Sequence, residues 1–305
     1  MTKINEFNII MYHRVIDDSV REDCSPSYRN ADIVVSLERF VQQIKHLKND
    51  YQIIRLDEAV DAYKSKHQMP NKVCALTFDD GFIDAYRNVF PVLKHFGLTA
   101  TFFIMGNPTF KEEPRWLDKF YFLIDNSTVN KFDFQWREFL LKNAKPQSRE
   151  SLLPLMLLLR ASSTKEQNEI LAELENTLAV HSDWSKLNGS LYISKENILE
   201  MSRSGMSFGA HTMTHPDLAK INLEEAREEI TTSAKLTKQL IGAEFMPFAY
   251  PFGGGATFNK KIINILIKNN VACACTSNIG TNSVDTPTFE LRRIPGEHLD
   301  RYLND

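Results

Sequence analysis

The sequence predicts an α/β fold built on parallel strands, and two observations support this class. Strand-like and helix-like segments alternate from residue 7 to residue 105, and the alternation resumes after residue 205. Repeated strand–helix units favour a parallel sheet whose neighbouring strands are joined by right-handed crossovers. Side chains suited to chemistry directly follow several of these strands, and the carboxyl ends of parallel strands meet at one face of such a fold.

The first third of the chain is expected to hold alternating strands and helices. A strand is expected where a short apolar run ends in turn residues, and a helix where apolar residues recur every three or four positions. Ser36 is a suitable cap for one helix and Gly97 ends another, because glycine adopts the left-handed C-cap conformation at low cost. The expected strands are 7–12, 53–56, 73–78 and 99–105, and the expected helices are 36–48, one that begins at Asp57, and 84–96.

A different pattern occupies the middle of the chain, where nearly every segment from residue 113 to residue 205 is typical of a helix or a polar connection. We expect a helical insertion over about residues 111–195, carried within a single domain that spans residues 1–305. The strand–helix alternation then returns. Its expected strands are 206–210, 248–250, 271–276 and 289–294, and its expected helices are 223–241 and 259–269.

Composition and charge exclude several functional classes. The 305 residues are 43% hydrophobic and 25% charged, which is typical of a globular protein with a packed core. The net charge of −3 and the lack of a basic run argue against nucleic acid as a partner. No apolar stretch is long enough for a transmembrane helix, and the N-terminus lacks the apolar core of a secretory signal. We therefore expect a cytoplasmic protein, with peripheral contact at the inner face of the membrane as an open alternative.

The four cysteines do not have the spacing of a metal or redox motif. They are expected to be reduced, buried thiols. Their positions are Cys24, Cys74, Cys273 and Cys275.

Two adjacent carboxylates, Asp79 and Asp80, follow the expected strand over residues 73–78. Neighbouring residues on an extended strand point to opposite faces, but a turn at Gly81 can rotate the second side chain into the same cavity. Two close carboxylates repel each other unless a cation or a proton lies between them. The pair therefore indicates a metal site, with an aspartate cap on the following helix as the structural alternative.

Two histidines four residues apart, His211 and His215, follow the expected strand over residues 206–210. This spacing predicts that both imidazoles lie on one face of a helical turn, as in other metal-binding histidine pairs. Zinc binds imidazole nitrogen and carboxylate oxygen, and a catalytic zinc site keeps one position for water. An isolated pair is more typical of surface or capping histidines, but together with the aspartates at an equivalent strand end it favours a metal site.

Several segments resemble the signature motifs of one family. They are residues 77–81 (TFDDG), the pair within residues 211–215 (HTMTH) and residues 248–253 (FAYPFG), with further agreement in residues 88–94 and 98–104. In order, spacing and strand context they resemble the NodB-type polysaccharide deacetylases, carbohydrate esterase family 4. The resemblance covers roughly residues 7–106 and 195–295, and the core motifs do not explain the helical stretch between them.

The resemblance implies a distorted (β/α)7-type barrel with fewer strands than the usual barrel of eight. It implies that Asp79 is the general base and that Asp80, His211 and His215 hold a divalent metal, with zinc as the first expectation and cobalt, nickel or manganese as alternatives. The backbone N–H of Phe252 resembles the oxyanion donor. In such a site the metal lowers the pKa of water and polarises the acyl oxygen, the base takes the water proton, and cation and amide stabilise the oxyanion.

The arginine that orients the base in this family is absent from its usual position, which is Met246 here. Arg293, on the last expected strand, is our candidate to reach the same place, and Arg292 would then face the other way. The alternative is that Arg293 is an ordinary arginine at the surface or at the end of a strand.

The late histidine that acts as the acid in this family is also not evident. Residues 10–15 (IMYHRV) resemble the N-terminal motif of poly-N-acetylglucosamine deacetylases, which implies that His13 is the general acid. The alternatives are His298 as the acid, and a purely structural role for His13 at the end of a strand. Trp116, Asp118 and Phe120 are further candidates for a sugar pocket, although packing in the core of the insertion is favoured.

The expected reaction is removal of an N-acetyl group from an amino sugar within a polysaccharide, an oligosaccharide or a lipid-linked sugar. The alternatives are a deformylase or another amidohydrolase acting on a lipid-linked sugar or a small cyclic amide, and a noncatalytic carbohydrate-binding protein. The complete set of ligands and the presence of Asp79 argue against a noncatalytic protein. A glycosidase is disfavoured because adjacent aspartates are poorly placed to flank a glycosidic bond.

Overall fold

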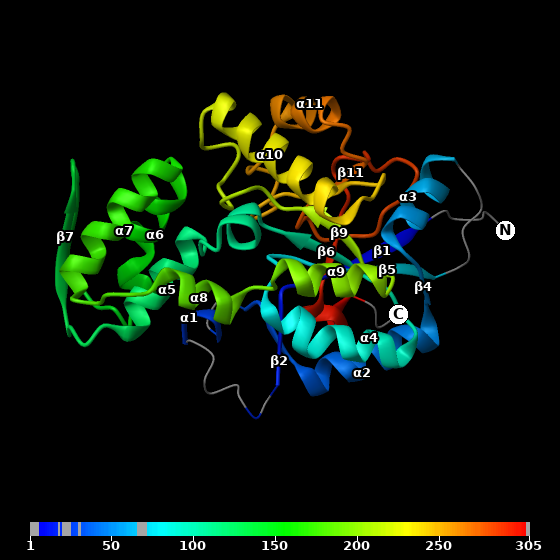
Figure 1. The fold of residues 1–305 in the computed structure, drawn as a ribbon, viewed down its shortest axis with the longest axis horizontal. Helices are drawn as coiled ribbons and strands as arrows, with labels where there is room; N and C mark the ends of the chain where they lie inside the picture. The colour runs from blue at the N-terminus through cyan, green and yellow to red at the C-terminus, as the bar shows by residue number, and fades with distance from the viewer. Residues whose placement is uncertain (1–5, 18, 20–25, 30–31, 66–71, 303–305) are drawn as a thin grey trace.

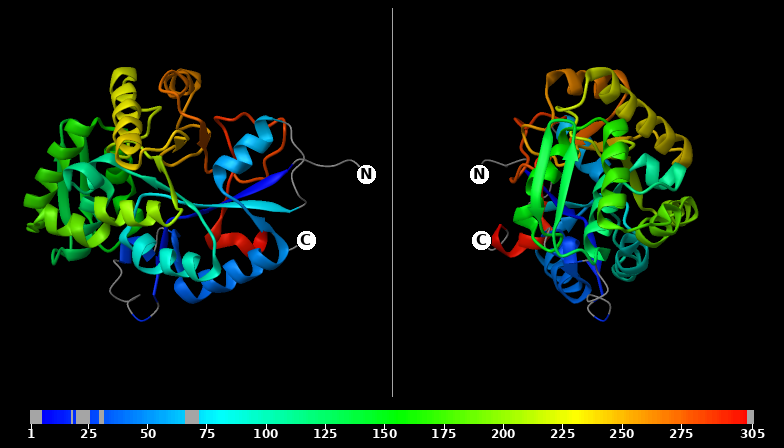
Figure 2. Two further views of the ribbon diagram at one scale, coloured as in Figure 1. Left: turned by 45° about the vertical axis from the view of Figure 1, so that its right-hand side comes forward. Right: turned by 90° about the vertical axis from the view of Figure 1, so that its left-hand side faces the viewer.

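The computed structural model describes residues 6–17, 19, 26–29, 32–65 and 72–302 (Figures 1 and 2). Its centre is a parallel sheet curled into a half-barrel with helices around it, as the sequence predicted. The strand order is β11-β10-β9-β6-β5-β1-β12, and β4 pairs with β5 beside this path. These strands are β1 (Phe7–Tyr12), β4 (Gln52–Ile53), β5 (Val73–Phe78), β6 (Thr101–Ile104), β9 (Ser207–Ala210), β10 (Pro247–Ala249), β11 (Cys273–Cys275) and β12 (Ile294–Pro295).

A short segment near the C-terminus connects the two edges of this sheet. Leu291 forms a parallel bridge with Cys275 in β11, and Ile294 of β12 pairs with Ile10 of β1. The sequence predicted a longer strand over residues 289–294. Regular pairing is limited because the backbone N–H groups of Arg292 and Arg293 instead donate to Asn282 and Asn278 in the preceding loop.

Helices cover the outer face of the sheet (Figure 1). Ser36 caps α2 by accepting a hydrogen bond from the Arg39 N–H at 3.2 Å, and Gly97 ends α4 with a φ of 65°. The expected helix over residues 84–96 is divided into a π-helical turn and α4, because Pro91 has no N–H to continue the ladder. These helices are α2 (Leu37–Asp50), α3 (Leu56–Lys64), η2 (Ala85–Val89), α4 (Phe90–Phe96), α9 (Lys195–Arg203), α10 (Leu223–Ile241) and α11 (Lys260–Lys268).

An aromatic ladder crosses four neighbouring strands under α2 and α4. The rings of Tyr12 and Phe78 stack at 5.2 Å, those of Phe78 and Phe102 at 5.0 Å, and Phe102 lies 5.6 Å from Phe208. All four rings are buried, and such pairs stabilise a sheet beyond their buried area. These ring contacts on the outer face of the sheet therefore stabilise the register of the strands that carry the site.

The insertion forms a lobe beside the barrel, at the left of Figure 1. The sequence predicted a helical insertion, and most of the lobe is helical, but residues 132–144 form an antiparallel hairpin that was not expected. Phe132 and Phe134 are buried while Asp133 and Gln135 are exposed. This alternation of apolar and polar residues is typical of a strand, but it covers too few residues to predict one. The lobe consists of α5 (Trp116–Asn126), β7 (Phe132–Trp136), β8 (Phe139–Ala144), α6 (Arg149–Ala161), α7 (Thr164–Leu178) and α8 (Trp184–Leu191).

The core of the lobe continues into the carboxyl-end face of the barrel. Phe82 and Met105, which follow β5 and β6, belong to the same buried cluster as Phe120 and Leu155 of the lobe. Shorter elements complete the fold near this face: β2 (Arg14–Ile16) paired with β3 (Val34–Ser36), α1 (Pro26–Arg29), η3 (Asn107–Lys111) and η4 (Gly296–Arg301).

Cys74, Cys273 and Cys275 are buried free thiols, as predicted, and Cys24 lies outside the described residues. Within the described ranges, none of the helices combines the length and the apolar character that crossing a bilayer requires.

We predict that Phe102→Ala lowers the free energy of unfolding by about 3–5 kcal/mol, because it leaves a cavity between Phe78 and Phe208. Urea denaturation followed by circular dichroism measures the change. Leu157→Ala on α6 is the control: its side chain is 54% exposed, so its cost should stay within about 0.5 kcal/mol. Equal costs for the two variants would contradict the assignment of the ladder to the core.

Candidate active site

A cavity of about 270 Å³ opens at the carboxyl ends of the strands. The seven residues to which the resemblance assigns a catalytic or metal-binding role all line it, although they come from five separate segments of the chain. Seven further wall residues were not predicted: Met11, Ile33, Arg115, Leu117, Tyr121, Tyr250 and Ser277. The predicted lining residues are His13, Asp79, Asp80, His211, His215, Phe252 and Arg293.

Asp79 and Asp80 reach the same cavity because the backbone turns sharply after β5. Asp80 has a φ of 73° and Gly81 a φ of 68°, so the left-handed conformation begins one residue earlier than the glycine suggests. Each aspartate is only 3% exposed. The turn therefore places two buried carboxylates side by side, and each needs its own compensating partner.

Arg293 is the partner of Asp79. Its Nη1 and Nη2 donate to the two carboxylate oxygens at 2.7 and 2.6 Å, and its Nε donates to the Thr276 carbonyl at 2.7 Å. Burial alone would raise the pKa of Asp79, but the guanidinium outweighs it and the pKa is lowered. Arg292 is exposed, as strand alternation predicted, and Met246 lies in an apolar cluster with α10 and α11.

Asp80, His211 and His215 form a cluster able to hold a cation. The Nε2 atoms of His211 and His215 lie 3.3 and 3.4 Å from Asp80 Oδ1, and one ligand atom from each residue lies within 4.8 Å of the others. His211 Nδ1 contacts the Ala249 carbonyl at 2.8 Å, which directs Nε2 toward the cluster. Burial lowers the pKa of His215 well below its usual range, so its ring remains neutral, as a ligand must be.

An unsatisfied atom of this cluster fits a bound cation. Asp80 Oδ1 is buried and has no hydrogen-bond partner among the described residues. Leaving a buried acceptor without a partner is costly, and a cation beside Oδ1 would remove that cost. One carboxylate oxygen and two imidazole nitrogens are also a ligand set that zinc favours.

The histidine pair does not lie on a helical turn, and this corrects the expectation from its spacing. Thr212 and His215 have φ of 64° and 62°, and the segment is a loop. Glu229 of α10 holds the loop by accepting the N–H groups of Met213 and Thr214 at 2.7 and 2.9 Å. Sequence analysis missed Glu229, although its place on the inward face of an amphipathic helix was an available signal.

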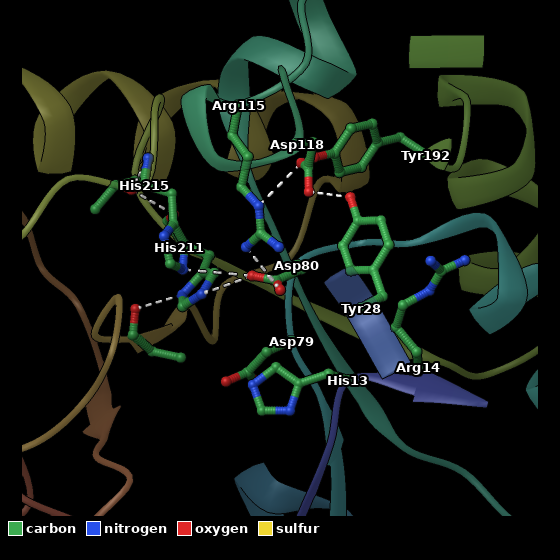
Figure 3. Close-up of polar contacts among 12 residues, drawn as sticks. His13, Arg14, Tyr28, Asp79, Asp80, Arg115, Asp118, Tyr192, His211 and His215 are labelled. Carbon is green, nitrogen blue, oxygen red and sulfur yellow. Dashed lines mark hydrogen bonds and ion pairs between the residues drawn. The ribbon is translucent and has the colours of Figure 1, made fainter. Parts of the chain in front are cut away.

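His13 directly follows β1 and projects into the cavity near Asp79 (Figure 3). Its Nδ1 lies 3.8 Å from Glu297 Oε1, which is an ion-pair distance too long for a hydrogen bond. Burial would lower the pKa of His13, but Glu297, Asp79 and Asp80 together raise it. His298, the alternative acid, instead contacts Asp32 at 2.8 Å and is not part of the cavity wall.

Phe252 occupies a strained turn whose amide is free. It has a φ of 61°, and among the described residues nothing accepts its N–H. Ser277 holds the turn by donating its hydroxyl to the Phe252 carbonyl at 2.7 Å and its N–H to the Gly253 carbonyl at 2.9 Å. A Cβ at Gly253 would lie 2.5 Å from Ser277 N, so only glycine fits there.

The insertion contributes differently from what was expected. Trp116 and Phe120 pack in the core of the lobe, as favoured, and do not line the cavity. The wall instead includes Arg115, whose Nη1 lies 2.8 Å from Asp80 Oδ2. The local signal for this arginine was an Arg–Asp pair three residues apart at the start of a helix, which the sequence analysis did not use.

Comparison with known proteins agrees with this geometry. The profile of the polysaccharide deacetylase family matches residues 66–133 and 160–274, which together exceed half of the chain. The chain belongs to the polysaccharide deacetylase family. Within it, the poly-β-1,6-N-acetyl-D-glucosamine N-deacetylase of Escherichia coli is 30% identical over 104 residues, which cover 34% of this chain and 14% of that protein.

Two further relatives cover most of the chain. YxkH of Bacillus subtilis, a member of the same family by its name, is 19% identical over 94% of this chain and 70% of its own length. The solved structure of the Streptococcus pyogenes deacetylase PplD in complex with acetate superposes with a TM-score of 0.63 at 20% identity, over 97% of both chains. That similarity shows the shared fold.

We predict that Arg293→Met destabilises the metal-free protein by about 3–5 kcal/mol at pH 7, because Asp79 is left buried without its partner. In the native protein the lowered pKa of Asp79 makes the pair stabilising above the usual value of about 3.9, and the contribution is lost as the pH falls through the lowered value. In the variant, burial raises this pKa. The destabilisation caused by Arg293→Met should therefore decrease from pH 7 toward about pH 4, as Asp79 becomes protonated.

Urea denaturation across this pH range, with chelator present, measures the difference. Arg292→Met is the matched control: that side chain is exposed, so its cost should stay within about 0.5 kcal/mol at every pH. A cost for Arg293→Met that does not depend on pH would show that Asp79 does not carry the buried charge.

Proposed function

We propose that this chain is a metal-dependent N-deacetylase that hydrolyses the N-acetyl group of an amino sugar. The observation that supports this most strongly is that a cluster of three metal-ligand side chains shares one cavity with the carboxylate of Asp79. A polysaccharide, an oligosaccharide and a lipid-linked sugar all present the same acetamide group. The family membership and the relative that acts on poly-β-1,6-N-acetyl-D-glucosamine favour an N-acetylglucosamine unit.

Asp80, His211 and His215 would hold the cation, with zinc favoured by two imidazole ligands. When bound, a divalent cation supplies Lewis acidity, because it lowers the pKa of a water molecule and polarises the acyl oxygen.

The remaining steps belong to residues of the chain. Asp79 is kept ionised by Arg293, so it can accept the proton of the attacking water. The free N–H of Phe252 is suited to donate to the acyl oxygen as negative charge develops there. His13, whose pKa is raised, is protonated over a wider pH range than a free histidine and can deliver a proton to the leaving amine.

We predict that the two adjacent aspartates have separable roles. Purified protein should bind one zinc ion per chain and release acetate from N-acetylglucosamine oligosaccharides. Asp80→Asn should lose both metal and turnover, because it weakens a ligand, as should His211→Ala and His215→Ala. Asp79→Asn should keep the metal and lose turnover by about a hundredfold or more, because only proton transfer is removed.

Metal analysis after dialysis and enzymatic assay of acetate give the two readouts. The wild-type protein treated with chelator, and then with added zinc, is the control for reversible loss. The assignment fails if Asp79→Asn loses the metal while Asp80→Asn retains it. Absence of acetate release from a protein loaded with zinc would contradict the proposed activity itself.

We predict that His13→Ala lowers kcat by about a hundredfold while metal content is unchanged. Glu297→Gln removes the carboxylate that lies beside His13 Nδ1 and helps to raise the pKa of His13. The alkaline limb of the pH–rate profile should therefore move to lower pH in Glu297→Gln, because the acid loses its proton earlier. His298→Ala is the control and should leave the alkaline limb in place. If His298→Ala moves the alkaline limb and Glu297→Gln does not, the acid is His298 and not His13.

A further inference from the structure

Asp80 is contacted by a residue of the insertion as well as by residues of the barrel. None of the sequence motifs described above includes the residue of the insertion. Arg115 is the N-cap residue of α5, and its side chain is 2% exposed. Its Nη1 lies 2.8 Å from Asp80 Oδ2, while its Nε donates to Asp118 Oδ2 at 2.9 Å. Figure 3 shows the guanidinium between the two carboxylates.

Asp118 is itself fixed by donors from separate segments. The hydroxyls of Tyr28 and Tyr192 both donate to its carboxylate, from α1 and from the segment that follows α8. The ring of Tyr192 stacks on Phe82 at 5.6 Å, and Arg115 lies over the same ring at 5.2 Å. The guanidinium therefore has little freedom to turn away from Asp80.

The two oxygens of Asp80 have different surroundings as a result. Oδ2 faces Arg115, whereas Oδ1 faces the Nε2 atoms of both histidines and has no hydrogen-bond partner among the described residues. A carboxylate with both oxygens free can chelate a cation through both of them. A catalytic site with three protein ligands needs a remaining position for water or substrate, which a second Asp80 oxygen would occupy.

We propose that Arg115 is a positioning residue that restricts Asp80 to one-oxygen ligation and so keeps a coordination position open. The inference rests on the metal site of the proposed function, but it does not depend on the identity of the sugar. It assigns the insertion a role in the metal centre: Asp118, Tyr28 and Tyr192 orient Arg115, and Arg115 orients Asp80.

Cobalt substitution tests this directly, because the position and intensity of the visible absorption of cobalt(II) change with the number and kind of its ligands. The metal-free protein is titrated to saturation with cobalt alone, without substrate. Arg115→Met should bind cobalt with a visible band that differs from the wild-type band in position and intensity, because the second Asp80 oxygen becomes a ligand. With zinc bound, its kcat should fall by about 10–100-fold.

Arg14→Met is the matched control. Arg14 is also a buried arginine that pairs with a carboxylate, Asp84, and its guanidinium also lies over the Phe82 ring, at 4.7 Å. Among the described residues, its partners do not include a metal ligand. Its cobalt band should match the wild type. Should Arg115→Met fail to fold, the double variant Arg115→Met/Asp118→Asn removes the buried charges of both Arg115 and Asp118 and is expected to show the same altered band.

An unchanged cobalt band at saturation in a folded Arg115 variant would overturn the proposal. If the variant changes the cobalt band but the wild type releases no acetate from any sugar, the role of Arg115 stands and the proposed substrate falls. If the wild type binds no cobalt at the cluster, both proposals fall together.

Discussion

The bidentate pair between Arg293 and Asp79 connects the closure of the barrel to the chemistry of its cavity. Arg293 lies on the segment that joins β11 to β1, and Asp79 follows β5 near the middle of the sheet. The same contact thus fixes the last segment of the barrel and keeps a buried carboxylate ionised. A charge at 3% exposure is tolerated only with such a partner, so the rest of the site is arranged around this pair.

Backbone strain is concentrated in the loops that carry the site. Asp80, Thr212, His215 and Phe252 all have positive φ, and such conformations cost of the order of 1–3 kcal/mol each for residues other than glycine. Each strained loop has a polar support: Arg115 for Asp80, Glu229 for the histidine loop and Ser277 for the turn at Phe252. These supports hold the ligands in a geometry that the isolated loops would not adopt.

Two arginines of the insertion contact the site. Arg115 contacts Asp80, and Arg160 of α6 pairs with Asp217 at 2.9 Å while its guanidinium lies 4.0 Å above the ring of Phe252. The lobe shares its core with residues that follow β5 and β6. A displacement of the lobe would therefore reach both the metal ligands and the turn that presents the free amide.

Much of this protein could be predicted from its sequence, because the relevant signals are local. Apolar periodicity and caps predicted the helix over residues 223–241 and the strand over residues 73–78. The ends of the expected strands then placed four site residues at one face: Asp79, Asp80, His211 and His215. The common edge of parallel strands then explains why residues far apart in the sequence meet in one cavity. The hairpin of the insertion was missed because its alternating pattern covers only five residues on β7.

Only the tertiary structure decided which side chains support the site. Arg115, Glu229 and Glu297 act on residues 35, 16 and 284 positions away. The local patterns around Arg115 and Glu229 do not indicate which residue each of them contacts. The left-handed conformations of Thr212 and His215 likewise depend on Glu229 rather than on their own preferences. These long-range contacts are needed because a buried polar group is costly without a hydrogen-bond or ion-pair partner, and the partner can lie far away in the sequence.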